Sequence, residues 1–229
     1  MIRGTSRLFF GEGKNDLKKT AIVSRFFRVI LMIEVEKKFS VGQDELARLI
    51  ARAQFLGEKK FTDVYYDTAD YALTKKDIWL RARSGKFELK FPMAGANEGQ
   101  DMTAYDEIED DAAIAAKLGI LGKGPIERLL APLGYLPFAT ITTTRSKYEK
   151  DGFHIDVDAV DFGYALLEIE LMVAAEGGIE AGYRRILNFA AMNGIPVSEK
   201  RIRGKVVEYL RRNDPDHFHA LEIAWGVKL

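Results

Sequence analysis

Polar and apolar residues alternate along many short segments of the chain. A period of two is typical of β-strands with one buried face. It predicts strands over residues 32–39, 61–67, 78–83, 86–91, 103–109, 140–150, 154–160 and 164–173. Ser84-Gly85 and Asp151-Gly152 separate consecutive segments, as the turns of two-residue hairpins do. The pattern therefore indicates a mostly antiparallel sheet.

Segments with a helical period lie between and after these strands. Apolar residues three and four positions apart predict helices over 44–55, 111–118, 125–133, 179–193, 205–212 and 215–225. Neither an internal repeat nor a linker divides residues 32–229. We therefore expect one α+β domain, in which an antiparallel sheet closes into a barrel or curls over its helices.

The composition excludes several classes of protein. The 229 residues include no cysteine and three histidines, which excludes disulfide scaffolds and thiolate metal sites. Lys+Arg and Asp+Glu both number 34, a balance that argues against general nucleic-acid binding. No apolar run has the length of a membrane span. We expect a cytoplasmic protein that binds neither nucleic acid nor membranes, and we favour a monomer.

Residues 1–31 differ from the rest of the chain in charge and pattern. They hold seven basic and two acidic residues, a net charge of +5, and they show no clear period. A basic segment poor in acidic residues is typical of a targeting peptide, for example to mitochondria. The alternation that begins directly after Met32 instead favours Met32 as the natural start. We favour this second interpretation, with 1–31 as a basic extension and the folded domain at 32–229.

Charged residues occupy one face of almost every predicted strand, and the opposite faces are apolar. On a single strand, this is typical of a sheet face exposed to solvent. The amphipathic helices, however, need an apolar surface to cover, which would place the charged faces inside. Because unpaired buried charges are costly, such an interior would have to be wet and to bind a charged ligand.

The charges have both signs, and this restricts the ligand. Guanidinium and ammonium groups bind phosphate oxygens, whereas carboxylates are the ligands that hard divalent cations prefer. Basic side chains alone would suit a simple anion, and carboxylates alone would suit calcium. The two together favour a complex of a metal ion with a polyphosphate.

Several motifs resemble the CYTH family, the triphosphate tunnel metalloenzymes. Glu34-Val35-Glu36-Lys37-Lys38 matches the ExExK signature of this family. Similar motifs follow in the family's order at residues 65–68, 79–83, 88–90, 105–107, 144–146, 156–158, 161–165, 168–170 and 204–210. The resemblance runs from Ile33 to about Phe218, and it is strongest to members that hydrolyse thiamine triphosphate.

The resemblance implies a fold and a set of ligand contacts. The implied fold is an eight-stranded antiparallel barrel that forms a tunnel, with helices packed around it. The residues implied to hold the triphosphate are Lys38, Arg81, Arg83, Lys90, Arg145 and Lys205. Those implied to hold Mg²⁺, directly or through water, are Glu34, Glu36, Glu107, Asp156, Glu168 and Glu170.

The resemblance also implies a reaction, the Mg²⁺-dependent hydrolysis of thiamine triphosphate to thiamine diphosphate and phosphate. Tyr65 and Lys90 match a pair that would activate water, although Tyr65 could be a packing aromatic and a second metal ion could replace the pair. Trp79 lies two and four residues before Arg81 and Arg83, so its side chain should point to the same face of the strand. Its indole could stack on the cationic ring of thiamine, or it could pack at the rim of the barrel.

Other functions fit parts of the same pattern. An inorganic triphosphatase would share the tunnel but would need no aromatic site at its mouth. A non-catalytic polyphosphate or nucleotide sensor could lose the carboxylates, so the presence of both charge sets argues against it. A lipocalin-like barrel for an apolar ligand is disfavoured by the charged inward faces.

A chain that starts at Met32 should keep the activity of the full chain, because the strand pattern begins there. Triphosphate hydrolysis and thermal unfolding of the two chains would test this. An insoluble or inactive shorter chain would show that residues 1–31 pack on the domain.

Overall fold

The computed structural model describes residues 32–92, 105–174, 178–197 and 202–229. The extension 1–31 and the first two residues of the predicted strand 103–109 lie outside these ranges. The described residues form one eight-stranded antiparallel sheet, with the strand order β1-β8-β7-β6-β2-β3-β4-β5. Its strands are β1 (Met32–Phe39), β2 (Gln54–Asp67), β3 (Trp79–Arg83), β4 (Lys86–Pro92), β5 (Tyr105–Ile108), β6 (Leu136–Lys150), β7 (Phe153–Val160) and β8 (Tyr164–Ala174).

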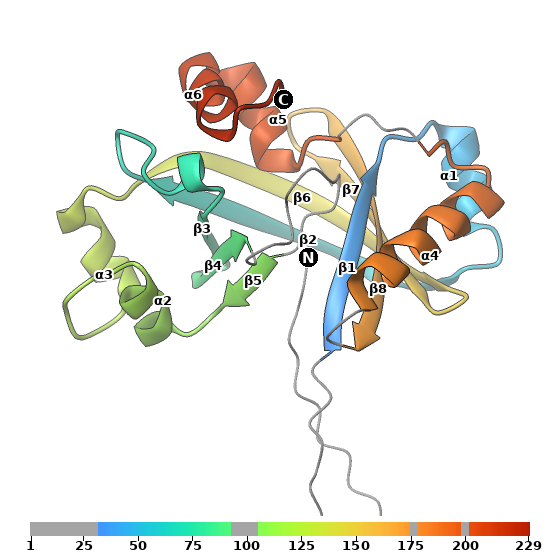
Figure 1. Ribbon diagram of the computed structural model, residues 1–229, viewed down its shortest axis with the longest axis horizontal. Helices are drawn as coiled ribbons and strands as arrows, with labels where there is room; N and C mark the ends of the chain where they lie inside the picture. The colour runs from blue at the N-terminus through green and yellow to red at the C-terminus, as the bar shows by residue number, and fades with distance from the viewer. Residues whose placement is uncertain (1–31, 93–104, 175–177, 198–201) are drawn as a thin grey trace, which may run out of the picture.

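The sheet curls into a half-barrel around which the helices are arranged (Figure 1). The predicted eight antiparallel strands are confirmed, but the sheet is not a closed barrel. Strands β1 and β5 are its two edges, and within the described residues they do not pair with each other. The long central pair β2 and β6 has register shifts at Phe55/Gly57 and Tyr65/Tyr66. Such shifts bend and twist strands, which helps the sheet to curl.

Two tight turns fix the register of neighbouring strands, as the sequence predicts. Ser84 and Gly85 join β3 to β4 with φ angles of 52° and 78°, and Asp151 and Gly152 join β6 to β7 with φ angles of 52° and 79°. Positive φ at both central residues is the geometry of a type I′ hairpin. The hairpins hold charged residues of adjacent strands opposite each other, as in the pair Arg145 and Asp158.

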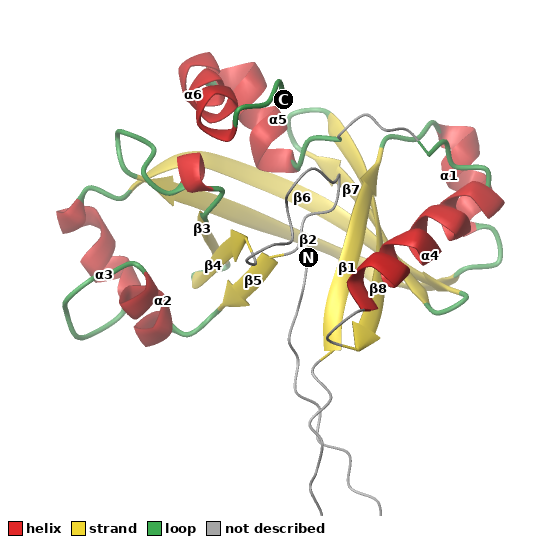
Figure 2. Ribbon diagram, in the orientation of Figure 1, coloured by secondary structure: helices red, strands yellow, loops and turns green. Residues whose placement is uncertain are grey.

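Six α-helices and two short 3₁₀ segments accompany the described strands (Figure 2). Helices α2, α3 and α4 pack on the outer, apolar side of the sheet, whereas α5 and α6 lie over one end of its inner face. Helix α4 packs on β1 and β8, where Val35, Ile169, Ile186 and Phe189 are buried together. A second cluster lies between β3, β4 and the short helices α2 and α3. The α-helices are α1 (Gln43–Ile50), α2 (Asp111–Lys117), α3 (Ile126–Leu130), α4 (Gly178–Met192), α5 (Lys205–Asn213) and α6 (Pro215–Trp225).

The predicted helix over 44–55 is too long. Helix α1 ends at Ile50, and Arg52 has a φ of 64°, which stops the helix. Strand β2 then begins at Gln54, well before the predicted start at residue 61, because Gln54 and Phe55 pair with Glu149 and Tyr148 of β6. Pairing with a distant strand therefore overrides the local helical pattern. Strand β6 also starts earlier than predicted, at Leu136.

Helices α5 and α6 are fixed over one end of the sheet by a buried histidine. The His217 side chain is fully buried, its Nε2 lies 2.7 Å from Thr74 Oγ1, and its ring stacks on Tyr71 with centroids 3.8 Å apart. Burial lowers the pKa of His217, so the ring is neutral near pH 7. Trp225 Nε1 donates a hydrogen bond to the Thr74 carbonyl at 3.1 Å. These contacts place the start of α5 against the inner face of the sheet.

No helix of the described residues combines the length and the apolar character that crossing a membrane requires.

The outward-facing core should determine stability. Ile169 is fully buried beneath α4, so Ile169→Ala should lower the free energy of unfolding by about 2–5 kcal/mol. Chemical denaturation would measure this. Ile223, which is 69% exposed on α6, is the control, and Ile223→Ala should stay within about 0.5 kcal/mol of the unsubstituted chain. Equal losses in the two variants would contradict this packing of the sheet.

Candidate active site

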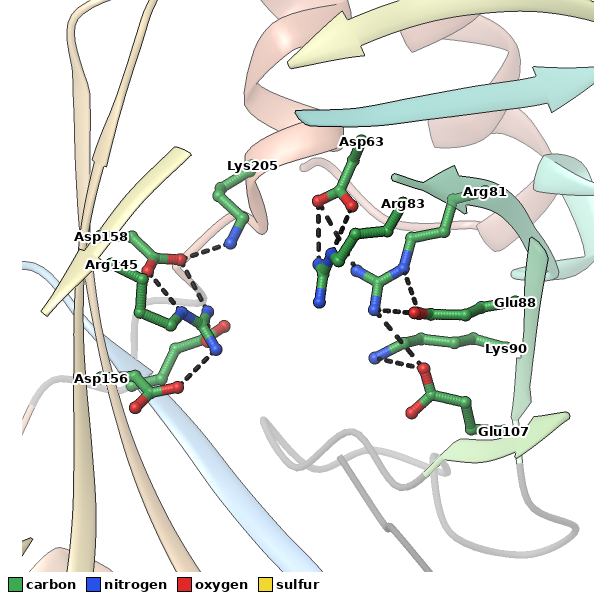
Figure 3. A network of polar contacts seen from close by, with 11 residues as sticks. Asp63, Arg81, Arg83, Glu88, Lys90, Glu107, Arg145, Asp156, Asp158 and Lys205 are labelled. Atoms are coloured by element: carbon green, nitrogen blue, oxygen red, sulfur yellow. Dashed lines mark hydrogen bonds and ion pairs between the residues drawn. The ribbon is translucent and has the colours of Figure 1, made fainter. Parts of the chain in front are cut away.

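The inner face of the half-barrel lines a cavity of about 460 Å³. Its walls carry charged side chains from both halves of the sheet, and α5 contributes Lys205 from one end. Figure 3 shows two charged networks that face each other across this space. The substrate-binding and catalytic residues predicted from the sequence all line it, namely Lys38, Tyr65, Trp79, Arg81, Arg83, Lys90, Arg145 and Lys205.

Arg145 is the centre of the first network. Its Nε lies 2.6 Å from Asp158 Oδ1, its Nη2 lies 2.7 Å from Glu168 Oε2, and its Nη1 contacts Asp156. Lys205 reaches Asp158 from α5, although the two residues are 47 positions apart. All five side chains are at most 9% exposed. A buried guanidinium with three carboxylates is held rigidly and cannot lose its charge.

The second network spans β2 to β5. Arg83 donates two hydrogen bonds to Asp63, from Nε at 2.7 Å and from Nη2 at 2.9 Å. Arg81 Nε donates to Glu88 at 2.7 Å, and its Nη2 lies 3.4 Å from Glu107. Asp63 is fully buried and also lies 3.8 Å from Arg81, so one carboxylate orients both arginines. Lys90 Nζ lies 3.6 Å from Glu107 in the same group.

Opposite charges, rather than burial, decide the ionisation of these groups. Burial alone would raise the pKa of Asp63 and Glu168. The hydrogen bond from Arg83 and the charges of Arg81 and Arg83 instead lower the pKa of Asp63. Lys38 and Arg145 likewise bring the pKa of Glu168 well below its usual range. Asp63 and Glu168 are therefore ionised at neutral pH.

The carboxylates of β1, β7 and β8 gather into two groups that share Glu170. Glu34, Glu36 and Glu170 form one group, and Asp156, Glu168 and Glu170 form the other. In each group the facing oxygen atoms lie within 4.8 Å of one another. Burial and the nearby charges of Glu34 and Asp156 raise the pKa of Glu170 well above its usual range. Asp156 Oδ1 is buried and accepts no hydrogen bond. This excess of negative charge is what a bound divalent cation would neutralise.

Glu107 lies apart from the other predicted metal ligands. It belongs to a group with Glu88 of β4 and Glu109, which directly follows β5, and it contacts Arg81 and Lys90. Strands β5 and β1 are opposite edges of the open sheet. The structure therefore brings together five of the six predicted ligands and places Glu107 in the second network.

Aromatic side chains surround one end of the cavity. The Trp79 ring meets the Tyr65 and Trp225 rings edge-on, with centroid distances of 6.4 and 6.1 Å. Asp77, in a left-handed conformation just before β3, accepts hydrogen bonds from Trp79 Nε1 at 2.8 Å and from Tyr105 Oη at 2.8 Å. The Asp77 carboxylate thus fixes the side chains of Trp79 and Tyr105. We call this end of the cavity, which is lined by Tyr65, Trp79, Tyr105 and Trp225, the aromatic mouth.

Sequence reasoning missed several residues of this cavity. Phe61, Asp63 and Tyr65 alternate on the inner face of β2, and this parity could have revealed Asp63. Asp158 shares the inward face of Asp156 in the sequence pattern, but its contacts with Arg145 and Lys205 were not predicted. Asp77 and Trp225 lie in segments without strand periodicity. Only the tertiary structure brings these two residues to the aromatic mouth.

The fold is a half-barrel whose inner face carries buried cations and clustered carboxylates. A sequence model of the CYTH domain matches residues 32–204, and the chain belongs to the CYTH family. Human thiamine-triphosphatase is 33% identical over 207 residues, which cover 83% of this chain and 89% of the human protein, and the protein from Macaca fascicularis has the same values.

Solved structures support the fold. A protein from Pyrococcus horikoshii has a TM-score of 0.56 at 20% identity, covering 79% of this chain and 99% of that one. A protein from Hippeastrum, described as a putative adenylyl cyclase with a dominant triphosphatase activity, has a TM-score of 0.51 at 18% identity, covering 87% and 98%. At these identities the likeness concerns the fold alone.

Glu170→Gln should stabilise the metal-free protein at neutral pH. Glu170 binds its proton more tightly in the folded chain than in the unfolded chain. The folded state therefore loses stability as the pH rises from the usual carboxyl pKa towards the raised one, and glutamine removes this loss. We expect the Tm to rise by about 2–4 °C for each kcal/mol gained.

Thermal unfolding in a metal chelator at pH 4 and pH 7.5 would test this, with a larger gain expected at the higher pH. Glu149→Gln, at an exposed position of β6, is the control and should leave the Tm unchanged at both pH values. A Tm of Glu170→Gln equal to or below that of the unsubstituted chain at pH 7.5 would contradict the charge crowding.

Proposed function

We propose that the protein hydrolyses thiamine triphosphate to thiamine diphosphate and phosphate and that the reaction depends on Mg²⁺. The observation that carries the proposal is one cavity that joins an array of buried cations, two clusters of carboxylates and an aromatic mouth. The relationship to thiamine-triphosphatases at 33% identity supports this choice of reaction. The family match from residue 32 supports a catalytic domain at 32–229.

The cations would hold the phosphate groups. These cations reach the cavity from four strands and one helix, and they are Lys38, Arg81, Arg83, Lys90, Arg145 and Lys205. Each already lies near a carboxylate, so its side chain keeps its position before substrate arrives. Phosphoryl transfer needs positioning and charge neutralisation more than covalent help, and preformed cations supply both.

The carboxylate clusters would hold Mg²⁺. Their donors are all oxygen, the ligand type that Mg²⁺ prefers, and the raised pKa of Glu170 shows that the negative charge is in excess there. The ion would be bound by the side chains of Glu34, Glu36, Asp156, Glu168 and Glu170. Glu107 would lie on the other side of the cavity, near the phosphates held by Arg81 and Lys90. When bound, Mg²⁺ would neutralise phosphate oxygens.

Tyr65 and Lys90, the pair predicted to activate water, lie beside Trp79 at the ring end of the cavity. Burial and the nearby Asp63 raise the pKa of Tyr65 to about 12, so its hydroxyl stays protonated at neutral pH. The two groups would therefore donate hydrogen bonds to the departing diphosphate rather than remove a proton from the attacking water. The water oxygen would add to the terminal phosphorus as the P–O–P bond breaks. The bridging oxygen would leave with the diphosphate, and one proton would be released.

The aromatic mouth would recognise the thiamine ring system. Trp79 offers an indole face, and Asp77 holds that indole and Tyr105 in place. A cationic heteroaromatic ring is attracted to such a face by stacking and by cation–π interaction. An inorganic triphosphatase would have no use for this arrangement, although its phosphate site could be the same.

Initial rates with thiamine triphosphate, tripolyphosphate and ATP, each with Mg²⁺ and with a chelator, would test the proposal. The proposal requires the highest kcat/KM for thiamine triphosphate and loss of activity in the chelator. A preference for tripolyphosphate would favour the inorganic triphosphatase. Tight binding of all three compounds without hydrolysis would favour a sensor.

Trp79→Ala should separate recognition of the ring from recognition of the phosphates. Losing the indole should cost about 1–3 kcal/mol in kcat/KM for thiamine triphosphate, and far less for tripolyphosphate, which has no ring. The ratio of the two values is the measurement, because a loss of folded protein cancels in it. Trp79→Phe should recover part of the ratio. An unchanged ratio in Trp79→Ala would assign Trp79 to packing alone.

A further inference from the structure

A second cavity, lined mainly by basic side chains, opens beside Arg83 and Arg145. It has a volume of about 280 Å³ and is lined by Lys59, Phe61, Arg83, Arg145 and Lys147, together with residues 56–58. Arg83 and Arg145 also line the main cavity. The two cavities therefore meet at these arginines, and the second cavity adds two lysines for which the proposed function has no use.

The register of the sheet gives the cavities a direction. Lys59, Phe61, Asp63 and Tyr65 alternate along β2, from the second cavity at Lys59 to the aromatic mouth at Tyr65. With about 3.3 Å per residue, this row is roughly 20 Å long. Strand β6 runs alongside, with Arg145 opposite Lys59 and Lys147 opposite Gly57. The cations of β2 and β6 thus continue past the main cavity, away from the aromatic mouth.

The charges of the second cavity suit a small anion. Four of its side chains are cations, and its own carboxylate, Glu58, accepts a hydrogen bond from Ser146 at 3.1 Å. Lys147 also lies 3.2 Å from Asp156, which belongs to one of the carboxylate clusters. The second cavity therefore adjoins both the arginines and a candidate metal site.

Phe61 lies at the junction of the two cavities. Arg83 lies over its ring at 4.1 Å from the centroid, and Arg145 and Lys205 lie at 5.9 and 5.8 Å. The ring lines the second cavity and contacts three cations of the main one. It therefore separates the two spaces, while the arginines can reach an anion in either of them.

We propose that the second cavity binds orthophosphate and is the route by which this product leaves. This inference rests on the proposed function. With the thiamine ring in the aromatic mouth, the terminal phosphate points towards Arg83, Arg145 and the two lysines. Hydrolysis then forms orthophosphate at that end, while the diphosphate still fills the main cavity and blocks the aromatic mouth. The second cavity is the basic opening next to the new anion.

Titration calorimetry of orthophosphate into the Mg²⁺-loaded enzyme, presaturated with thiamine diphosphate, tests this directly. The unsubstituted enzyme should bind orthophosphate together with the diphosphate. Lys59→Gln and Lys147→Gln should each weaken orthophosphate binding about threefold, and the double variant about tenfold, as expected for partly exposed charges. Thiamine diphosphate affinity should stay unchanged. Lys60→Gln, on the outer face next to Lys59, is the matched control and should change neither affinity.

Mutually exclusive binding of orthophosphate and the diphosphate would overturn the inference, and so would orthophosphate affinity that is unchanged in the double variant. A second series with pyrophosphate in place of thiamine diphosphate removes the ring from the test. If thiamine triphosphate is not hydrolysed, the proposed function fails. The pyrophosphate series still shows whether the second cavity binds orthophosphate, so the two failures are distinguishable.

Discussion

The fold depends on neutralising charges that face inward. A half-barrel whose inner face carries arginines, lysines and carboxylates is stable only if each charge has a partner, because unpaired buried charges are costly. Two groups of ion pairs meet this requirement. Arg145 lies between Asp156, Asp158 and Glu168, and Asp63 lies beneath Arg81 and Arg83. The same pairs hold the cations in position, so one set of contacts supports both the structure and ligand binding.

The carboxylate clusters are the exception to this pairing, and for that reason they are informative. Glu170 shares a small buried space with four other acids, and burial together with this crowding raises its pKa. Networks that served stability alone would not collect like charges in this way. Local destabilisation at buried charges is typical of functional sites, where a ligand supplies the missing opposite charge.

Much of this arrangement could be predicted from the sequence, because the inner face repeats every two residues along each strand. Parity identified Arg81, Arg83, Arg145 and Glu168 without any structure. It failed where position depends on distant parts of the chain. Asp77 lies outside the periodic segments, and the start of β2 is decided by pairing with β6. Lys205 could be predicted only from the family resemblance. Periodicity could not identify it, because its helix is positioned by the contacts of α6.

Those contacts connect the proposed phosphate site to a remote part of the core. His217 and Trp225 of α6 bind Thr74, which immediately precedes the Asp77 turn that orients the aromatic mouth. Helix α5, joined directly to α6, brings Lys205 to Asp158. A displacement of α6 would therefore disturb the ring end and the phosphate end of the cavity together. Because both ends depend on one anchored helix pair, the fold itself sets the distance between the aromatic mouth and the cations.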